Sequence, residues 1–113
     1  MLLMESIYKK LKAESLVENA EAFSQKWCNR SRSWYAVQKC SNSDLSVQAA
    51  VACLRRSQAR LIISHLQRKR LGSAIDAEIE TLRDVISCLE AHLRDKHCIL
   101  SVVPVEVRKP KML

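Results

Sequence analysis

Glycine is almost absent from this chain, which has a single glycine, Gly72, and two prolines, Pro104 and Pro110, among 113 residues. Tight hairpin turns and phosphate-binding loops depend on glycine, because glycine adopts positive φ angles at little cost. The apolar content of 48% is ordinary for a folded chain. The sequence therefore predicts an all-α protein with one small core.

Positive charge is concentrated in the middle of the chain. Residues 24–72 contain ten Lys and Arg and one acidic residue, Asp44, a net charge of +9, whereas residues 73–98 contain six acidic and three basic residues. Such a block points to a polyanionic partner, either nucleic acid or an anionic membrane surface, with a solvated basic face as the alternative. No apolar run approaches the roughly 20 residues of a membrane span, so we expect a soluble intracellular protein.

The cysteines are dispersed and odd in number: Cys28, Cys40, Cys53, Cys88 and Cys98. Without a Cys-x-x-Cys pair they predict neither a disulfide framework nor a zinc knuckle. Zinc could be shared by Cys88, His92, His97 and Cys98, but adjacent ligands at 97 and 98 are geometrically awkward. We therefore expect reduced, mostly buried thiols, no metal and no cofactor.

Three helical segments are predicted. The first spans residues 3–28, and its apolar stripe changes side, so it either breaks near residue 14, with Ser15 and Glu18 capping a new start, or is buried on both sides. Residues 29–43 form a connection in which Trp34–Val37 docks as a short turn. The second helix has Ser43 as N-cap, Asp44 in its first turn and Gly72 after its end.

The second helix is predicted to be amphipathic. One face carries basic side chains, and the other is expected to be the apolar face, with His65 as a core histidine. The residues of this apolar face are Val47, Val51, Leu54, Leu61, Ile62 and His65.

The third segment runs from Ser73 and Asp76, at capping-box spacing, to about Lys96. Its apolar positions alternate at intervals of four and three residues, which forms a heptad seam. The seam lies either on the helix's own core or in an intermolecular coiled coil, and a homodimer is favoured because three helices give a small core. Residues 1–98 then form one helical domain, and 99–113 a loosely ordered basic tail. The predicted dimerisation residues are Ile75, Ile79, Leu82, Ile86, Leu89 and Leu93.

No set of residues suggests catalysis, because there is no nucleophile with a base, no phosphate loop and no isolated carboxylate pair. We therefore expect a binding protein and not an enzyme. Arginines spread along a long helix suit contact with a phosphate backbone better than the reading of bases.

The run Arg60–Ile75, RLIISHLQRKRLGSAI, resembles the second helix and following turn of the small RNA-silencing suppressors of insect nodaviruses, and a fainter similarity covers residues 7–23. The resemblance implies an all-helical homodimer that forms a four-helix bundle and grips double-stranded RNA by its backbone, without regard to sequence. By position, Arg60 matches the family's central RNA-contacting arginine, whereas Cys53 stands where the family has a lysine.

Such a viral protein would act in the host cytoplasm, shield long double-stranded RNA from Dicer and sequester small interfering RNA, with host Dicer-type machinery as a further candidate partner. Two other classes stay open: a dimeric helical DNA-binding or regulatory protein, and a coiled-coil adaptor that uses the 75–93 seam. The predicted RNA-binding residues are Arg55, Arg56, Arg60, Ser64, Gln67, Arg68 and Arg70.

Overall fold

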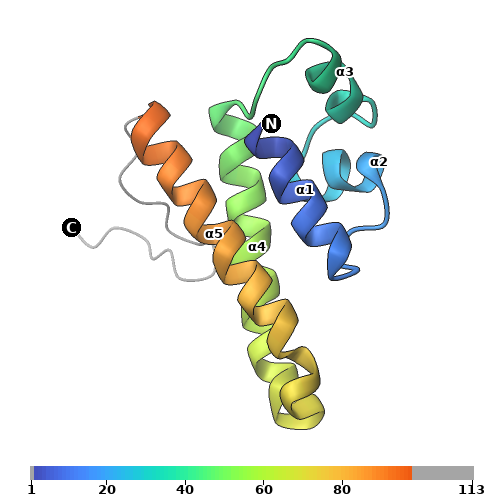
Figure 1. The fold of residues 1–113 in the computed structure, drawn as a ribbon, viewed down its shortest axis with the longest axis vertical. Coiled ribbons are helices and arrows are strands. Elements are labelled where there is room, and N and C mark those ends of the chain that lie inside the picture. Colours follow the sequence, from blue (N-terminus) through green and yellow to red (C-terminus); the bar gives the residue numbers. More distant parts are fainter. Residues whose placement is uncertain (1, 98–113) are drawn as a thin grey trace, which may run out of the picture.

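The structure, a computed structural model, describes residues 2–97, and every regular element in that range is a helix (Figure 1). The all-α prediction is confirmed for these residues, and the predicted basic tail lies outside them. The elements are α1 (Leu3–Ala13), α2 (Ala20–Ala22), the π-helical turn η1 (Phe23–Trp27), α3 (Trp34–Cys40), α4 (Val47–Leu71), the 3-10 turn η2 (Gly72–Ile75) and α5 (Asp76–His97).

The long helices α4 and α5 form an antiparallel hairpin, and α1 packs against it (Figure 1). The prediction for the end of α4 is confirmed, because Gly72 follows Leu71 with a φ of 61°, a conformation that costs other residues more. The predicted N-cap is wrong. Ser46, and not Ser43, caps α4, since its Oγ accepts a hydrogen bond from the backbone N–H of Ala49 at 3.2 Å.

The first predicted segment is broken. α1 ends at Ala13, the chain turns at Ser15 with a φ of 59°, and a new helix begins at Ala20. The break near residue 14 is therefore confirmed, but its predicted cap is wrong. Asn19 caps the restart, with Oδ1 accepting from the backbone N–H of Ala22 at 2.8 Å, because Ser15 adopts the left-handed conformation instead of the extended one of an N-cap.

Asp44 caps α1 from the segment before α4, instead of lying in the first turn of α4. Its carboxylate accepts backbone N–H hydrogen bonds from Leu3 at 2.8 Å, Met4 at 3.0 Å and Leu45 at 2.9 Å. The first N–H groups of a helix have no partner within the helix, and negative charge is favourable beside them. Asp44 therefore joins the first helix to the start of the hairpin.

The core lies where α1 and η1 cover the hairpin. The predicted seam runs from Ile75 at the end of η2 along α5, and Ile86 is partly buried whereas the other five residues are buried, so the seam is used within a single chain. A homodimer therefore stays a prediction. The largest fully buried apolar side chains include Met4, Ile7, Leu11, Phe23, Leu54, Leu82, Val85, Leu89 and Leu93.

The buried face of α4 agrees with the predicted one only in part, because Leu54 is buried and Val47, Val51 and Leu61 pack against the core. It is lined mostly by small side chains, namely Ala49, Ala50, Cys53, Leu54, Ser57 and Ser64. The predicted core positions Ile62 and His65 are exposed. A stripe of Ala and Ser lets a neighbouring helix approach closely, yet its low hydropathy hides it from a pattern based on large apolar residues.

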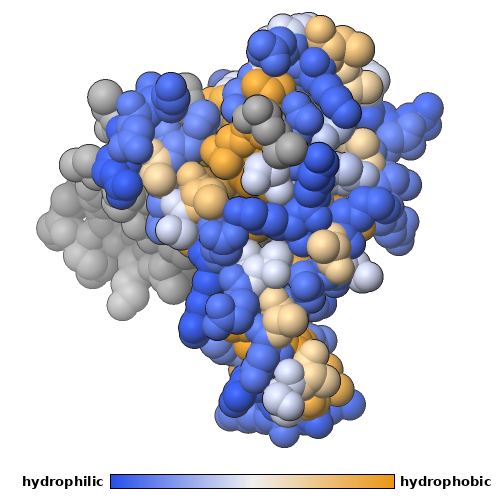
Figure 2. All heavy atoms as spheres, viewed as in Figure 1, coloured by the Kyte–Doolittle hydropathy of each residue, from blue (hydrophilic) through white to orange (hydrophobic). Residues whose placement is uncertain are grey.

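The surface in Figure 2 is mostly hydrophilic, with apolar side chains at the projecting tip of the hairpin. Large apolar side chains that stay exposed near this tip include Leu66 and Leu71. None of the helices described in residues 2–97 is long and apolar enough to cross a membrane.

Candidate nucleic-acid interface

The predicted RNA-binding face of α4 is interrupted by ion pairs to α5. Arg60 places Nη2 3.3 Å from Oε2 of Glu78, and the hydroxyl of Ser64 donates to the same carboxylate. Arg68 contacts Asp76 at two points, with Nε to Oδ1 at 2.6 Å and Nη2 to Oδ2 at 3.3 Å. Arg60, Ser64 and Arg68 therefore hold the hairpin together.

The carboxylates of Glu78 and Asp76 reduce the positive charge that Arg60 and Arg68 present to a polyanion. The side chain of Glu78 is only 16% exposed, so its charge depends on Arg60 and Ser64 for compensation. The hydrogen bond from Arg68 lowers the pKa of Asp76, and the same contact raises the pKa of Arg68. A phosphate group would compete at both arginines with a carboxylate already in place.

The other predicted RNA-binding residues form no ion pair within residues 2–97. Arg56 is exposed, and its guanidinium lies 5.5 Å from the ring centroid of Trp27. Arg70 is exposed, whereas Arg55 and Gln67 are partly buried. Arg56 and Arg70 share one side of α4 but lie about 21 Å apart along its axis. This side of α4 therefore has an exposed arginine at Arg56 and at Arg70 and no continuous row of exposed cations between the two.

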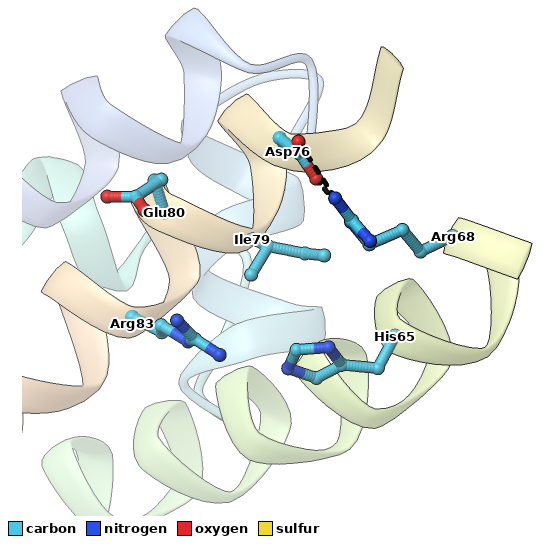
Figure 3. Close-up of a pocket in the computed structure, with 6 residues that line it drawn as sticks. All are labelled: His65, Arg68, Asp76, Ile79, Glu80 and Arg83. Atoms are coloured by element: carbon cyan, nitrogen blue, oxygen red, sulfur yellow. Dashed lines mark hydrogen bonds and ion pairs between the residues drawn. The ribbon is translucent and has the colours of Figure 1, made fainter. Parts of the chain in front are cut away.

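An open groove lies between α4 and α5 near the hairpin tip (Figure 3), lined by His65, Arg68, Asp76, Ile79, Glu80 and Arg83. Its charged side chains carry both signs, so the groove does not favour a polyanion. His65 lies in this groove and is exposed, which corrects its prediction as a core histidine.

Of the four candidate zinc ligands, only Cys88 and His92 have side chains that the structure describes. Within residues 2–97 no group of three or more His, Cys, Asp and Glu side chains could hold a metal ion. Cys88 lies with Sγ 3.8 Å from Nζ of Lys10, and Cys98 and the side chain of His97 fall outside the description.

A second basic surface lies on the segment that was predicted to be a connection. Between Glu21 and Asp44 the chain has no acidic residue. Its basic residues, all exposed, are Lys26, Arg30, Arg32 and Lys39, which we call the α2–α3 cationic segment. Arg32 is 73% exposed and approaches Glu21 only to 3.8 Å. These cations therefore remain available to a partner.

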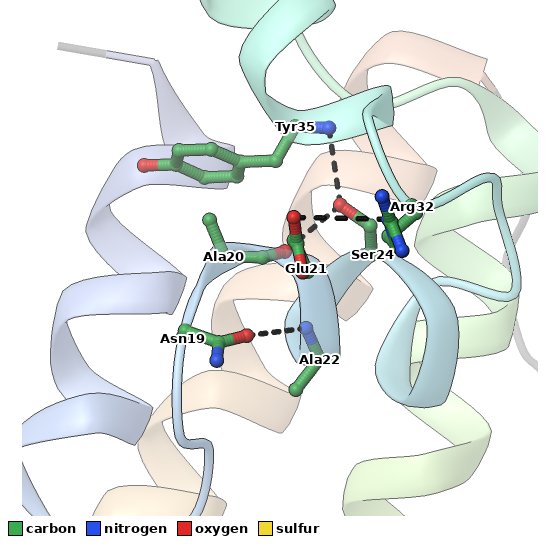
Figure 4. A network of polar contacts seen from close by, with 7 residues as sticks. All are labelled: Asn19, Ala20, Glu21, Ala22, Ser24, Arg32 and Tyr35. Atoms are coloured by element: carbon green, nitrogen blue, oxygen red, sulfur yellow. Dashed lines mark hydrogen bonds and ion pairs between the residues drawn. The ribbon is translucent and has the colours of Figure 1, made fainter.

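Ser24 fixes α3 to α2 (Figure 4). Its fully buried Oγ donates to the carbonyl oxygen of Ala20 at 2.9 Å and accepts from the backbone N–H of Tyr35 at 3.0 Å. The N–H of Tyr35 belongs to the first turn of α3, where no acceptor exists within the helix. One side chain thus satisfies this donor and sets the distance between the two helices.

The connection from Cys28 to Ser33 is held by its backbone. Asn29 adopts a φ of 54°, a conformation that asparagine tolerates better than most residues. The N–H of Arg30 then donates to the carbonyl oxygen of Ser24 at 2.8 Å. The arginine-bearing connection therefore starts from a fixed point on η1.

Three aromatic rings join α1, η1 and α3. The ring centroids of Tyr8 and Phe23 are 5.6 Å apart, those of Tyr8 and Tyr35 are 4.9 Å apart, and those of Phe23 and Tyr35 are 5.8 Å apart. Separations of this size are favourable for aromatic pairs. The cationic segment is thus mounted on helices whose aromatic side chains pack into the core of the protein.

A family model described as a family of unknown function, DUF6626, matches residues 4–99. The chain belongs to this family. The DUF6626 match covers both the α4–α5 hairpin and the α2–α3 cationic segment. No curated protein and no solved structure matches the chain. The resemblance to nodavirus suppressors stays a prediction.

Sequence reasoning missed the α2–α3 unit of this DUF6626 member because each of its helices contributes only a few apolar side chains to the core. Trp34 and Tyr35 are buried, but serines and arginines surround them and lower the hydropathy. A usable signal was the placement of Phe23 and Trp27 before Asn29, and of Trp34 and Tyr35 after it. Two short apolar clusters around a residue that tolerates positive φ indicate paired helices.

Proposed function

We propose that this protein binds duplex nucleic acid without catalysing a reaction, and that the α2–α3 cationic segment contacts the phosphate backbone. The observation that carries the proposal is the acid-free stretch between Glu21 and Asp44, whose Lys and Arg side chains are all exposed. Its mounting on α2 and α3 through Ser24 and Tyr35 adds support, because a fixed array of charges loses less conformational entropy on binding.

Arginine suits this role. Its planar guanidinium offers parallel donors to phosphate oxygens, and it stays charged at every physiological pH. Each phosphate that is neutralised releases counterions, so the affinity for B-form DNA should fall with salt at a slope of about 0.9 per contact. Binding through the cationic segment is therefore expected to be steeply salt dependent.

The silencing-suppressor hypothesis is a finer proposal, which would make the duplex RNA and the site of action the host cytoplasm. It depends on the resemblance in Arg60–Ile75 and on a homodimer. The contacts of Arg60 with Glu78 and of Arg68 with Asp76 argue against α4 as the main contact surface. The coiled-coil adaptor loses its main support, because the 75–93 seam lies inside the chain.

The test is fluorescence anisotropy with labelled duplexes of random sequence, between about 50 and 200 mM salt. The double variant Arg30→Ala/Arg32→Ala should bind at least about tenfold more weakly than the parent, a loss of 1.4 kcal/mol or more. The control, Arg83→Ala/Arg94→Ala, removes two exposed arginines from α5 and should change affinity less than about twofold. Equal losses in the two variants, or a flat response to salt, would refute the proposal.

A further inference from the structure

We infer that α2, η1 and α3 form a helix-turn-helix unit that places α3 in the major groove of DNA. This inference rests on the proposed function and adds to it the class of duplex and the element that enters the groove. In such units a first helix crosses the phosphate backbone and a second, joined by a short turn, contacts the base edges.

The dimensions and the turn are suitable. α3 has 7 residues, which makes it about 10 Å long, and the major groove of about 12 Å admits an α-helix. The connection runs from Cys28 to Ser33, somewhat longer than the typical three or four residues. Asn29 supplies the positive φ, 54°, that glycine often supplies in such turns.

The side chains of α3 divide into an inner and an outer face. On the inner face, Trp34 and Tyr35 are buried, and Nε2 of Gln38 donates to the carbonyl oxygen of Asp44 at 3.0 Å. The outer side chains Ala36 and Val37 are exposed. The inner contacts thus hold α3 rigidly while its outer face stays free.

The outer face has the chemistry that a groove requires. Lys39 is exposed on α3, and Arg32 and Ser33 precede its first turn, so cationic and hydroxyl donors flank the helix. Val37 is 55% exposed, and an apolar side chain on a recognition helix can contact the methyl group of thymine. α3 carries no carboxylate that phosphates would repel.

The same geometry discriminates between DNA and RNA. The major groove of A-form RNA is deep and narrow, so side chains on a helix cannot reach its base edges. A protein that uses only dispersed phosphate contacts would bind both duplexes similarly. Insertion of α3 therefore predicts a preference for DNA.

The experiment measures competition between DNA and RNA duplexes of equal length and sequence for the full chain. DNA should compete at least about tenfold better than RNA. Methylation of guanine N7, which lies in the major groove, should interfere with binding at the preferred site selected from a random library. Preference for RNA, or no interference, would overturn the inference.

A matched pair of variants locates the contact. Ala36→Glu on α3 and Ala77→Glu on α5 introduce the same charge at exposed helical alanines. Ala36→Glu should weaken DNA binding at least about tenfold, and Ala77→Glu less than about twofold. If Arg30→Ala/Arg32→Ala weakens binding but Ala36→Glu does not, the helix-turn-helix inference is wrong and the proposed function stands. If the parent binds no duplex, both are wrong.

Discussion

The buried hydroxyl of Ser24 accepts a hydrogen bond from the backbone N–H of Tyr35 at 3.0 Å, and so joins two helices through a single side chain. The same hydroxyl donates to the carbonyl oxygen of Ala20 at 2.9 Å. Because Ser24 lies on η1 and Tyr35 in the first turn of α3, the orientation of α3 depends on this contact.

Ser24→Ala should destabilise the protein by about 1 to 3 kcal/mol, because it leaves the N–H of Tyr35 buried without an acceptor. The matched control is Ser57→Ala. Ser57 is also fully buried and donates to the carbonyl four residues before it, at 2.8 Å, but it accepts no backbone N–H in the described contacts. Urea unfolding should show a clearly larger loss for Ser24→Ala. Equal losses would contradict a special role for Ser24.

Arg60→Met should lower stability by about 1 kcal/mol, since the Arg60 side chain is 34% exposed and solvent screens its contact with Glu78. Affinity for duplex nucleic acid should change less than about twofold. Arg70→Met, which removes an exposed arginine without an ion pair in residues 2–97, serves as the stability control. A tenfold loss of RNA binding by folded Arg60→Met would instead favour the α4 surface.

Arg68→Gln should return the pKa of Asp76 toward its ordinary value of 3.8, because the hydrogen bond from Arg68 lowers that pKa in the folded protein. A depressed carboxyl pKa stabilises the fold at pH values above the ordinary one, and this stabilisation is lost as the pH falls through the depressed value. NMR titration of the Asp76 carboxyl carbon in parent and variant measures the shift. The same midpoint in both would show that the pair does not persist in solution.

Cys40 should react with iodoacetamide much faster than Cys28 in the native protein. Cys40 is exposed and Cys28 is buried, and the hydrogen bond with Cys53 together with burial raises the pKa of the Cys28 thiol, so little reactive thiolate forms. Mass spectrometry of each cysteine-containing peptide over time gives the two rates. In denaturant the rates should converge, and similar rates in the native state would contradict the buried position of Cys28.

The elements with strong local signals were the ones that sequence predicted well. Gly72 ends α4 because no other residue near it takes a positive φ so easily, and the seam of α5 marks its buried side. The buried side of α4 could not be found in this way, because Ala, Cys and Ser form much of it. Nor did the pattern show whether the seam faces the same chain or a second one.

The candidate site was harder to predict because the net charge of a surface depends on the ion pairs that form between α4 and α5. Arg60 and Arg68 look like a basic stripe, with Ser64 between them, until α5 brings Glu78 and Asp76 beside these residues. The pair of Arg68 and Asp76 could be predicted from the sequence, because both residues lie four positions from Gly72 and must meet if the chain reverses there. The α2–α3 unit depends on Ser24 and Tyr35, whose contact no periodic pattern reveals.

The position of Asp44 also sets an order of events during synthesis. The N–H groups of Leu3 and Met4 at the start of α1 donate to a carboxylate that the ribosome adds 41 and 40 residues later, respectively. Short isolated helices are marginal in water. α1 should thus stay unformed on the nascent chain until Asp44 has left the exit tunnel.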